Sequence, residues 1–367
     1  MIRPVFEIDP DISRASTPSS PVYRDPRVYE LVREQVFAPS WQLVGDTYQV
    51  RVPGQVQPLT LLEGCLDEPL LLTRDRDDRL HCVSNVCTHR GNLVCEQGGV
   101  ESGLRCRYHG RRFALDGTFI SMPEFEGVVG FPSEGDHLPK VAHAVWGPLI
   151  FVSLKPKVAF DEWIGSVRER VAWLPLHELR FDPGRSRDYL VQANWALYCE
   201  NYLEGFHIPY VHASLNEVLD YGNYRTELFR WSSLQVGFAK DGQPAFDLPN
   251  ASPDFGQPIA GYYFWLFPNL MLNFYPWGLS INVVKPLGVD RTRISFLAYV
   301  SDASKLDVGA GSELDRVERE DEAIVEAVQK GLRSRLYDRG RYSPTREQGT
   351  HHFHRLLAES TTPTAEC

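Results

Sequence analysis

The chain has 367 residues and a mass of 41.8 kDa, too much for one ordinary hydrophobic core, so we expect two domains or one large domain with an insertion. Its formal charge of -10 argues against a nucleic-acid-binding surface, and no run of about 18 apolar residues is available to cross a membrane. The N-terminus lacks a basic region followed by an apolar stretch, so we expect a cytoplasmic protein whose seven cysteines are reduced.

Residues 1–40 predict a helical arm that packs on the second half of the chain. The stretch "DPRVYELVREQVFAPSW" favours a helix because Asp25 is a suitable N-cap and Pro26 occupies the first helical position, where its missing N–H is tolerated. The apolar residues recur at helical spacing and are Val28, Leu31, Val32 and Val36. We interpret them as the face that packs against the rest of the protein.

Residues 41–155 are typical of a small all-β domain. Short alternating or apolar runs, such as "EPLLLTRDRDDRLHCVSNV", are interrupted by Gly, Asp and Pro residues, as expected for strands joined by turns. The charged segment "RDRDDR" at residues 74–79 lies between two such runs. We interpret it as a hairpin turn rather than as a functional basic patch.

Residues 156–367 mix helical and strand-like segments. "FDEWIGSVRERVAWL" and "ELDRVEREDEAIVEAVQKGLRSRLY" have helical periodicity, whereas "GYYFWLFPNLMLNFYPW", "LSINVVKP" and "TRISFLAYVSD" are typical of strands. The fold class expected for the whole chain is therefore α+β, with an all-β domain first and a mixed domain second.

Two Cys–His pairs stand in the β domain, Cys87 with His89 and Cys106 with His109. Thiolates and imidazoles in short-spaced pairs suit either a structural zinc ion or a Rieske cluster, in which two histidines replace two cysteines on one iron of a [2Fe–2S] centre. Zinc fingers usually group Cys with Cys and His with His, whereas here each loop supplies one of each, which favours the cluster. Gly91 and Gly110 would let both loops turn tightly around it, with backbone N–H groups directed at the sulfurs.

A second candidate metal site lies in "NWALYCENYLEGFHIPYVH", residues 194–212. His207 and His212 are five residues apart, and a regular α-helix would separate them by about 140°. Pro209 lies between them and disrupts a helix, so we expect the imidazoles to converge because the helix is broken there. A His pair of this kind is weak evidence for a metal unless a carboxylate joins it.

The helix expected at residues 313–336 supplies such a carboxylate. Asp321 falls in the middle of its apolar stripe, whereas we expect Glu320 and Glu322 to point elsewhere; the stripe consists of Leu314, Val317, Ile324, Val325, Val328 and Leu332. A carboxylate on a core face is costly unless a positive group meets it. Two histidines and Asp321 would form the facial triad of Fe(II) oxygen-activating enzymes, although a buried Arg or a backbone N–H would also satisfy Asp321.

Together the two constellations resemble the alpha subunits of Rieske non-haem iron oxygenases, the ring-hydroxylating oxygenase family, across nearly the whole chain. The segments "EDEAIVEAVQKGL" and "HHFHRLL" look particularly similar to its choline monooxygenase and carnitine oxygenase branch. The resemblance implies a Rieske [2Fe–2S] domain at 41–155 and a mononuclear iron domain at 156–367, whose curved antiparallel sheet and helices form a helix-grip fold. One residue departs from the pattern, since Arg111 stands where these oxygenases commonly have Trp.

The resemblance also implies roles for individual residues. The family pattern of an acid, a His three residues later, a His five further on and a late Asp matches Glu204, His207, His212 and Asp321. The last three would bind Fe(II), and Glu204 would connect His109 of one subunit of a homotrimer to His207 of the next. Most family members have Asp at the position of Glu204. Asn201 matches an Asn close to the mononuclear iron.

The same resemblance implies the partners of the protein. O2 would be the co-substrate, and a separate NAD(P)H-dependent reductase, with or without a ferredoxin, would supply the electrons. The chain contains no GxGxxG that opens a helix after a strand, so we expect the nicotinamide and flavin sites to lie on that other protein.

The "HHFH" segment, His351, His352 and His354, is another apparent metal motif. On a helix these three side chains cannot all face one ion. We therefore expect packing or surface histidines.

Aromatic residues are concentrated in the segment 262–277 and provide a hypothesis about the substrate. They would fill a sheet core equally well, so sheet packing is the simplest interpretation. The alternative is that some of them face the iron, and the candidates are Tyr263, Trp265, Phe267, Phe274 and Trp277. Such rings would bind a quaternary ammonium by cation–π attraction of ~0.5 to 2 kcal/mol, but they would suit an aromatic substrate as well.

We therefore expect an enzyme that hydroxylates, oxidatively dealkylates or cleaves a small organic molecule, with a quaternary ammonium compound as the candidate substrate. Hydroxylation of an aromatic ring is the alternative within the same reaction class. A Rieske electron-transfer protein with a ligand-binding domain, or a zinc-stabilised binding protein, is the non-enzymatic alternative.

Overall fold

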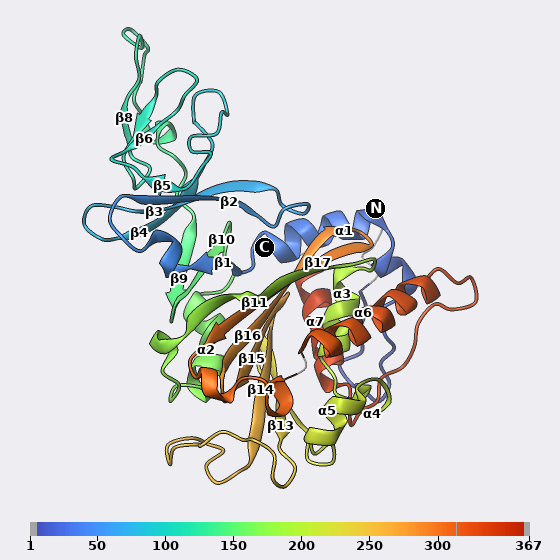
Figure 1. Cartoon of the computed structure of the whole chain (residues 1–367). Helices are drawn as coiled ribbons and strands as arrows, with labels where there is room; N and C mark the ends of the chain where they lie inside the picture. The colour runs from blue at the N-terminus through green and yellow to red at the C-terminus, as the bar shows by residue number, and fades with distance from the viewer. Residues whose placement is uncertain (1–5, 313, 363–367) are drawn as a thin grey trace. The chain divides into compact units, whose positions relative to one another are not determined.

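The computed structural model describes residues 6–312 and 314–362 (Figure 1). Contacts within the chain divide it into two compact units, Ala38–Lys157 and the remainder, which comprises the segments up to Phe37 and from Val158. The domain boundaries expected from the sequence are at residues 41 and 155. The predicted α+β class, with strands first and mixed structure after them, is confirmed. Among the described helices, none is both long enough and apolar enough to span a membrane.

The unit Ala38–Lys157 is built from three small antiparallel sheets, in the strand orders β1–β10–β9, β4–β3–β2–β5 and β6–β7–β8. The strands are β1 Gln42–Asp46, β2 Gln55–Leu61, β3 Glu68–Arg74, β4 Leu80–Ser84, β5 Gly99–Val100, β6 Leu104–Arg105, β7 Arg112–Phe113, β8 Phe119–Ser121, β9 Ala142–Trp146 and β10 Leu149–Ser153. Its core includes Val56, Leu71, Val83 and Phe113, and both cysteines of the predicted cluster loops belong to it. The loops are therefore anchored in the hydrophobic core.

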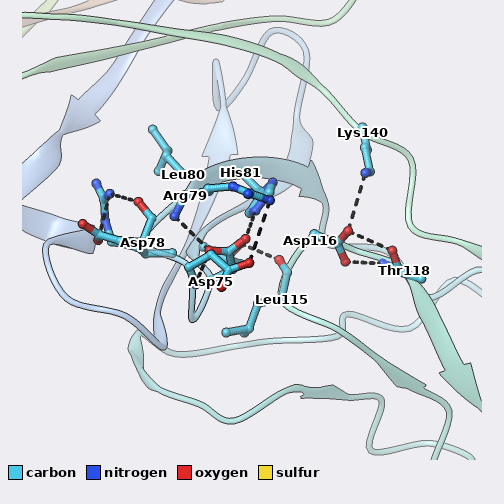
Figure 2. Close-up of polar contacts among 12 residues, drawn as sticks. Asp75, Asp78, Arg79, Leu80, His81, Leu115, Asp116, Thr118 and Lys140 are labelled. Carbon is cyan, nitrogen blue, oxygen red and sulfur yellow. Dashed lines mark hydrogen bonds and ion pairs between the residues drawn. The ribbon is translucent and has the colours of Figure 1, made fainter.

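The charged segment at residues 74–79 forms a hairpin turn between β3 and β4, as predicted. The carboxylate of Asp75 accepts hydrogen bonds from the backbone N–H groups of Asp77 (2.9 Å) and Arg79 (2.8 Å). Figure 2 shows the same carboxylate against the ring of His81, whose Nε2 lies 2.7 Å from Oδ2 of Asp75. Because the acidic group holds the turn together from within, the segment has a structural role.

The second unit is organised around a seven-stranded antiparallel sheet in the order β11–β17–β16–β15–β14–β13–β12 (Figure 1). The strands are β11 Arg180–Val191, β12 Arg225–Leu228, β13 Ser232–Phe238, β14 Ile259–Leu266, β15 Leu270–Tyr275, β16 Gly278–Gly288 and β17 Arg291–Val300. Every residue of β14 and β15 is buried, so both faces of the sheet centre are covered.

Helices of this unit pack on one another and on the sheet (Figure 1). They are α1 Pro26–Val32, α2 Phe160–Arg170, α3 Trp195–Tyr202, α4 Ile208–Val211, α5 Ala213–Val218, α6 Leu314–Gly331 and α7 Gln348–Thr361. Tyr202 of α3 donates a hydrogen bond to Asn273 on β15 (2.7 Å), and Phe353 of α7 meets the ring of Trp265 on β14. Because side chains of Asn273 and Trp265 share one face of the sheet, α3 and α7 cover that face.

The N-terminal arm begins its helix as predicted. The side chain of Asp25 accepts the backbone N–H of Arg27 (2.9 Å), and Pro26 is the first residue of α1. The predicted apolar face is largely buried, since Val28, Val32 and Val36 are buried. Earlier in the arm, the backbone N–H of Thr17 donates to the carbonyl of Gly340 (3.1 Å). The arm thus packs on the same unit as the late helices.

The predicted stripe of α6 is wrong at Ile324 and Val328, which are 40% and 44% exposed. The buried face instead contains Glu318 and Gln329. Each accepts one hydrogen bond there: the hydroxyl of Tyr198 on α3 donates to Glu318 (2.5 Å), and the backbone N–H of Asn194, at the start of α3, donates to Gln329 (2.8 Å). Because such partners let polar side chains occupy buried positions, apolar spacing alone misassigned the face.

The three histidines of the "HHFH" segment are packing residues, which is one of the two roles predicted for them. His354 is fully buried on α7, with Nδ1 2.6 Å from the hydroxyl of Tyr342 and Nε2 2.9 Å from a carboxylate oxygen of Glu200. His351 is buried as well, and burial lowers the pKa of His352 to about 4. His354 thus connects α7 to α3, whereas Nε2 of His351 lies 2.8 Å from the carbonyl oxygen of Asp9, so the three rings have separate partners.

Candidate active site

The two predicted cluster loops have the same backbone geometry, the first after β4 and the second after β6. In each loop a glycine four residues after the cysteine donates its N–H to the cysteine carbonyl, Gly91 to Cys87 (2.9 Å) and Gly110 to Cys106 (3.0 Å). Both glycines have a positive φ, +70° and +75°, a conformation that side chains with a Cβ rarely adopt. The glycines therefore close both turns.

The four candidate cluster ligands separate into a sulfur pair and a nitrogen pair. Nδ1 of His89 lies 3.1 Å from Nδ1 of His109, and the buried thiols of Cys87 and Cys106 interact with each other. Backbone N–H groups of Tyr108 and His109 point at the Cys106 sulfur. A zinc ion would draw all four ligand atoms to one point. In the described ranges, however, the group of three or more ligand atoms that lie within 4.8 Å of one another is found elsewhere. The two pairs fit the two irons of a Rieske cluster.

The group of ligand atoms that does converge belongs to His207, His212 and Asp321. Nε2 of His207 lies 3.2 Å from Nε2 of His212, and Oδ1 of Asp321 lies 3.5 and 3.0 Å from these nitrogens. The imidazoles meet because α4 has only one turn, with His207 at its N-cap and His212 directly after its end. The predicted cause is wrong, since Pro209 occupies the first turn of α4, where proline is tolerated, and does not break a longer helix.

A carboxylate contacts the other ring nitrogen of each histidine. Oε1 of Glu204 lies 2.7 Å from Nδ1 of His207, and Oε2 of Glu320 lies 2.8 Å from Nδ1 of His212. The expectation that Glu320 points away from the site is wrong, because its flexible side chain reaches the buried His212 beside α6. When Nδ1–H is donated to a carboxylate, each Nε2 presents a lone pair to the centre, which is the tautomer that a metal requires.

The arrangement of these acceptors fits a cation. Two Nε2 lone pairs and the Asp321 carboxylate repel one another unless a positive charge lies between them, and two histidines with one carboxylate are the donor set of non-haem Fe(II). Burial alone would lower the pKa of His212, but Asp321 and Glu320 outweigh it and raise that pKa. Within the described chain, the hydrogen bonds and ion pairs of Asp321 are with the two histidines rather than with a buried Arg.

The three converging groups open into a cavity of about 770 Å³, its open mouth included. Its walls come from α3, α4, α5, α6 and the sheet, and Asn201 and Glu204 lie on them. Five tyrosines line it: Tyr198, Tyr202, Tyr224, Tyr263 and Tyr275. Among the described lining residues there is no Lys or Arg, so the wall is aromatic and acidic.

Of the five aromatic candidates for the substrate wall, the described lining includes Tyr263 alone. Phe274 lies on the opposite face of the sheet, where its ring packs 6.3 Å from that of Phe264. Trp265 shares the face of Tyr263 but lies against Phe353 of α7, at 5.2 Å between ring centroids. These two candidates are core residues because a strand alternates its faces and a helix covers part of the inner one.

The remaining candidates also lie off the wall. Phe267 follows the end of β14 and packs against Trp265, and Trp277 stacks behind Tyr275 at 5.4 Å and 15°. The prediction missed Tyr198, Tyr202, Tyr224 and Tyr275 as lining residues. A signal was present in the sequence, since polar residues in otherwise apolar strands mark the cavity face: Asn273, Ser280 and Asn282.

A buried acid, Glu318, also faces the cavity, three residues before Asp321 on α6. Its Oε2 accepts the hydroxyl of Tyr198, and its Oε1 has no hydrogen-bond partner within the described structure. Burial, reinforced by the charge of Asp321, raises the pKa of Glu318 well above its usual range. Glu318 therefore favours its protonated form more strongly than a solvent-exposed glutamate does.

Comparison with known families defines the class of the protein. The chain matches the ring hydroxylating alpha subunit (catalytic domain) over residues 176–362 and the Rieske [2Fe-2S] domain over residues 40–132. The chain belongs to this family of Rieske non-haem iron oxygenases, which use a [2Fe–2S] cluster, a mononuclear iron and O2.

Individual relatives lie in one branch of that family. Choline monooxygenase, chloroplastic, of Arabidopsis thaliana is 33% identical over 379 residues, which cover 96% of this chain and 85% of that protein. The carnitine monooxygenase oxygenase subunit of Escherichia coli (strain K12) is 28% identical, covering 92% and 91%. A solved quaternary ammonium Rieske monooxygenase shares the fold, with a TM-score of 0.77 at 22% identity over 95% and 96% of the two chains. The resemblance to the choline and carnitine branch is confirmed.

Proposed function

We propose that the protein is the oxygenase component of a system that oxidises a quaternary ammonium compound. The observation that carries the proposal is the cavity wall, which has tyrosine rings and acidic groups and, in its described lining, no Lys or Arg. An aromatic face attracts an alkylated ammonium by ~0.5 to 2 kcal/mol, whereas a cationic wall would repel it. The relatives named as choline, carnitine and glycine betaine monooxygenases support the same substrate class.

His207, His212 and Asp321 are the side chains that would hold the mononuclear iron, which supplies O2 activation when bound. The carboxylates beside the two histidines keep their Nδ1 protonated and their Nε2 available. The tyrosine rings would hold the ammonium methyl groups beside this centre, and the buried wall would exclude water. Overall, one C–H bond becomes C–OH, and O2, two electrons and two protons yield the inserted oxygen and one water.

The electrons come from a separate reductase, because this chain is the oxygenase subunit of a Rieske system. We propose an NAD(P)H-dependent reductase, with or without a ferredoxin, and Cys87, His89, Cys106 and His109 as ligands of the receiving cluster. We also propose a cytoplasmic homotrimer in which Glu204 connects His109 of one subunit to His207 of the next. The Glu204–His207 contact supports half of that link, and inter-subunit electron transfer is described for the related quaternary ammonium monooxygenase.

Substrate-dependent O2 consumption tests the substrate class. The purified protein, supplied with NADH and a generic Rieske reductase, is assayed with choline, L-carnitine, glycine betaine and naphthalene. We expect O2 consumption and an oxidised product with at least one quaternary amine. A response to naphthalene alone would replace this proposal with ring hydroxylation.

Tyr263 provides a sharper test of the aromatic wall. Its ring is confined between two glycines, since a Cβ at Gly237 or Gly261 would lie 2.9 Å from it. Tyr263→Leu is expected to raise KM for the ammonium substrate by ~2- to 30-fold, because one cation–π contact is lost. The KM of Tyr263→Phe should stay near that of the parent protein. Steady-state kinetics measure both variants.

The control is the neutral isostere of that substrate, with a quaternary carbon in place of nitrogen, assayed as a competitive inhibitor. Its inhibition constant should be similar for Tyr263→Leu and Tyr263→Phe. If Tyr263→Leu weakens the binding of the neutral and the charged molecule equally, the ring contributes shape complementarity rather than attraction for a cation.

A further inference from the structure

Arg111 is a fully buried arginine that directly follows the second cluster loop. It is 1% exposed, and its carbonyl oxygen accepts the backbone N–H of Cys106 (2.8 Å). A buried guanidinium is costly unless it is paired and surrounded by compatible groups. The surroundings of Arg111 must therefore replace the water that it has lost.

Three aromatic rings and one carboxylate provide these surroundings. The guanidinium carbon of Arg111 lies 4.9, 5.6 and 5.7 Å from the ring centroids of Phe119, Phe131 and Phe113. Its Nη2 donates to Oδ1 of Asp136 (2.6 Å) and to the carbonyl oxygen of the same residue (3.0 Å). In the described structure its Nε has no hydrogen-bond partner. The positive charge is thus fixed among apolar groups, where screening by solvent is weak.

The same contacts join Arg111 to both cluster loops. The carbonyl of Asp136 that accepts from Arg111 also accepts from Oγ1 of Thr88 (2.9 Å), a residue of the first loop between the two candidate ligands. The backbone of Arg111 holds the second loop through Cys106. The guanidinium and its counter-charge are therefore part of the frame around the cluster site.

The charge of Arg111 lies close to the candidate ligands, because its carbonyl accepts the N–H of Cys106 and its guanidinium shares the Asp136 carbonyl with Thr88. A reduced cluster carries one more negative charge than an oxidised one, so a fixed cation nearby favours reduction and a fixed anion opposes it. Asp136 carries the negative charge that opposes the effect of Arg111 on reduction. Its side chain is 18% exposed, whereas that of Arg111 is 2% exposed.

We propose that Arg111 raises the reduction potential of the Rieske cluster and that Asp136 lowers it. Arg111 would act as a positioning residue: it would carry no electron, and the charges of Arg111 and Asp136 would not change on reduction of a bound cluster. The inference depends on the cluster domain and not on the identity of the substrate.

A redox titration of the full-length protein, followed by visible absorption or EPR without substrate, tests this inference. Arg111→Trp is expected to shift the midpoint potential downward, and Asp136→Asn is expected to shift it upward. Arg111→Lys keeps the charge and should shift it less than Arg111→Trp. The matched control is Arg107→Gln in the second loop, whose side chain is 71% exposed and screened by water, and which should leave the potential unchanged.

Opposite shifts for the two members of the pair are the signature of charge, because a general loosening of the loops would move both potentials in one direction. If Arg111→Trp assembles too little cluster, as judged from iron content and visible absorption, Asp136→Asn and Arg111→Lys decide. An unchanged or lowered potential in Asp136→Asn overturns the proposal, as does a potential in Arg111→Trp at or above that of the parent.

Discussion

Replacing His207 with Ala is expected to reduce substrate-dependent O2 consumption to background while the [2Fe–2S] cluster stays in place. Nε2 of His207 is one of the three converging ligand atoms, and Ala supplies no donor for the iron. The cluster loops belong to the other compact unit, so they should assemble normally. Metal analysis should find about one iron atom fewer per chain, with the rhombic EPR signal of the reduced cluster unchanged.

The matched control is His352→Ala, which removes a partly buried imidazole of α7 that lies outside the converging group. This variant should keep its iron and its turnover. Turnover at the parental rate in His207→Ala would show that His207, His212 and Asp321 do not hold the iron that activates O2.

Replacing Glu204 with Gln is expected to lower turnover by ~10- to 100-fold while both iron centres remain loaded. The carboxylate of Glu204 contacts Nδ1 of His207 and also accepts its backbone N–H (3.1 Å). Gln keeps the size of the side chain and one acceptor but loses the charge that polarises the imidazole. In the proposed trimer it would also weaken the link to His109 of the next subunit.

A single-turnover experiment separates these effects from loss of iron. The pre-reduced protein is mixed with substrate and O2, and the return of the oxidised cluster absorption is followed. In Glu204→Gln this step should be slow although the cluster is fully reduced at the start. Glu204→Asp keeps the negative charge and should retain more of the rate. Parental rates of cluster oxidation in Glu204→Gln would exclude Glu204 from the electron route.

The residues at the two candidate metal sites were accessible from the sequence because the chemistry demands particular residue types at short spacings. The loop pairs and the His207–His212 pair are local patterns, and Asp321 was found as an acid on a helix face. Glu320 was missed for a physical reason: neighbouring residues diverge by about 100° around a helix, yet a long side chain can bend back to a ring buried against that helix.

The candidate substrate wall could not be located in the same way. Five aromatic candidates were chosen by their density in one segment, but a dense aromatic segment fills both faces of a sheet and also the contacts with covering helices. The cavity takes its tyrosines from α3, from the segment before β12 and from the sheet, and Tyr202 and Tyr224 meet the sheet only after folding. Such convergence depends on tertiary packing, which spacing along the chain does not record.

Helix α4 has a single turn, too short to persist in water without support. Its support comes from its two ends, where His207 is tied to Glu204 and His212 to the acids of α6. A ferrous ion bound there would connect this segment to α6. Because the ion would bind the folded chain and not the unfolded one, iron binding would stabilise the fold by mass action. Iron supply in the cell would then govern how long the protein survives as well as how fast it works, because iron-depleted chains would open locally more often and meet proteases.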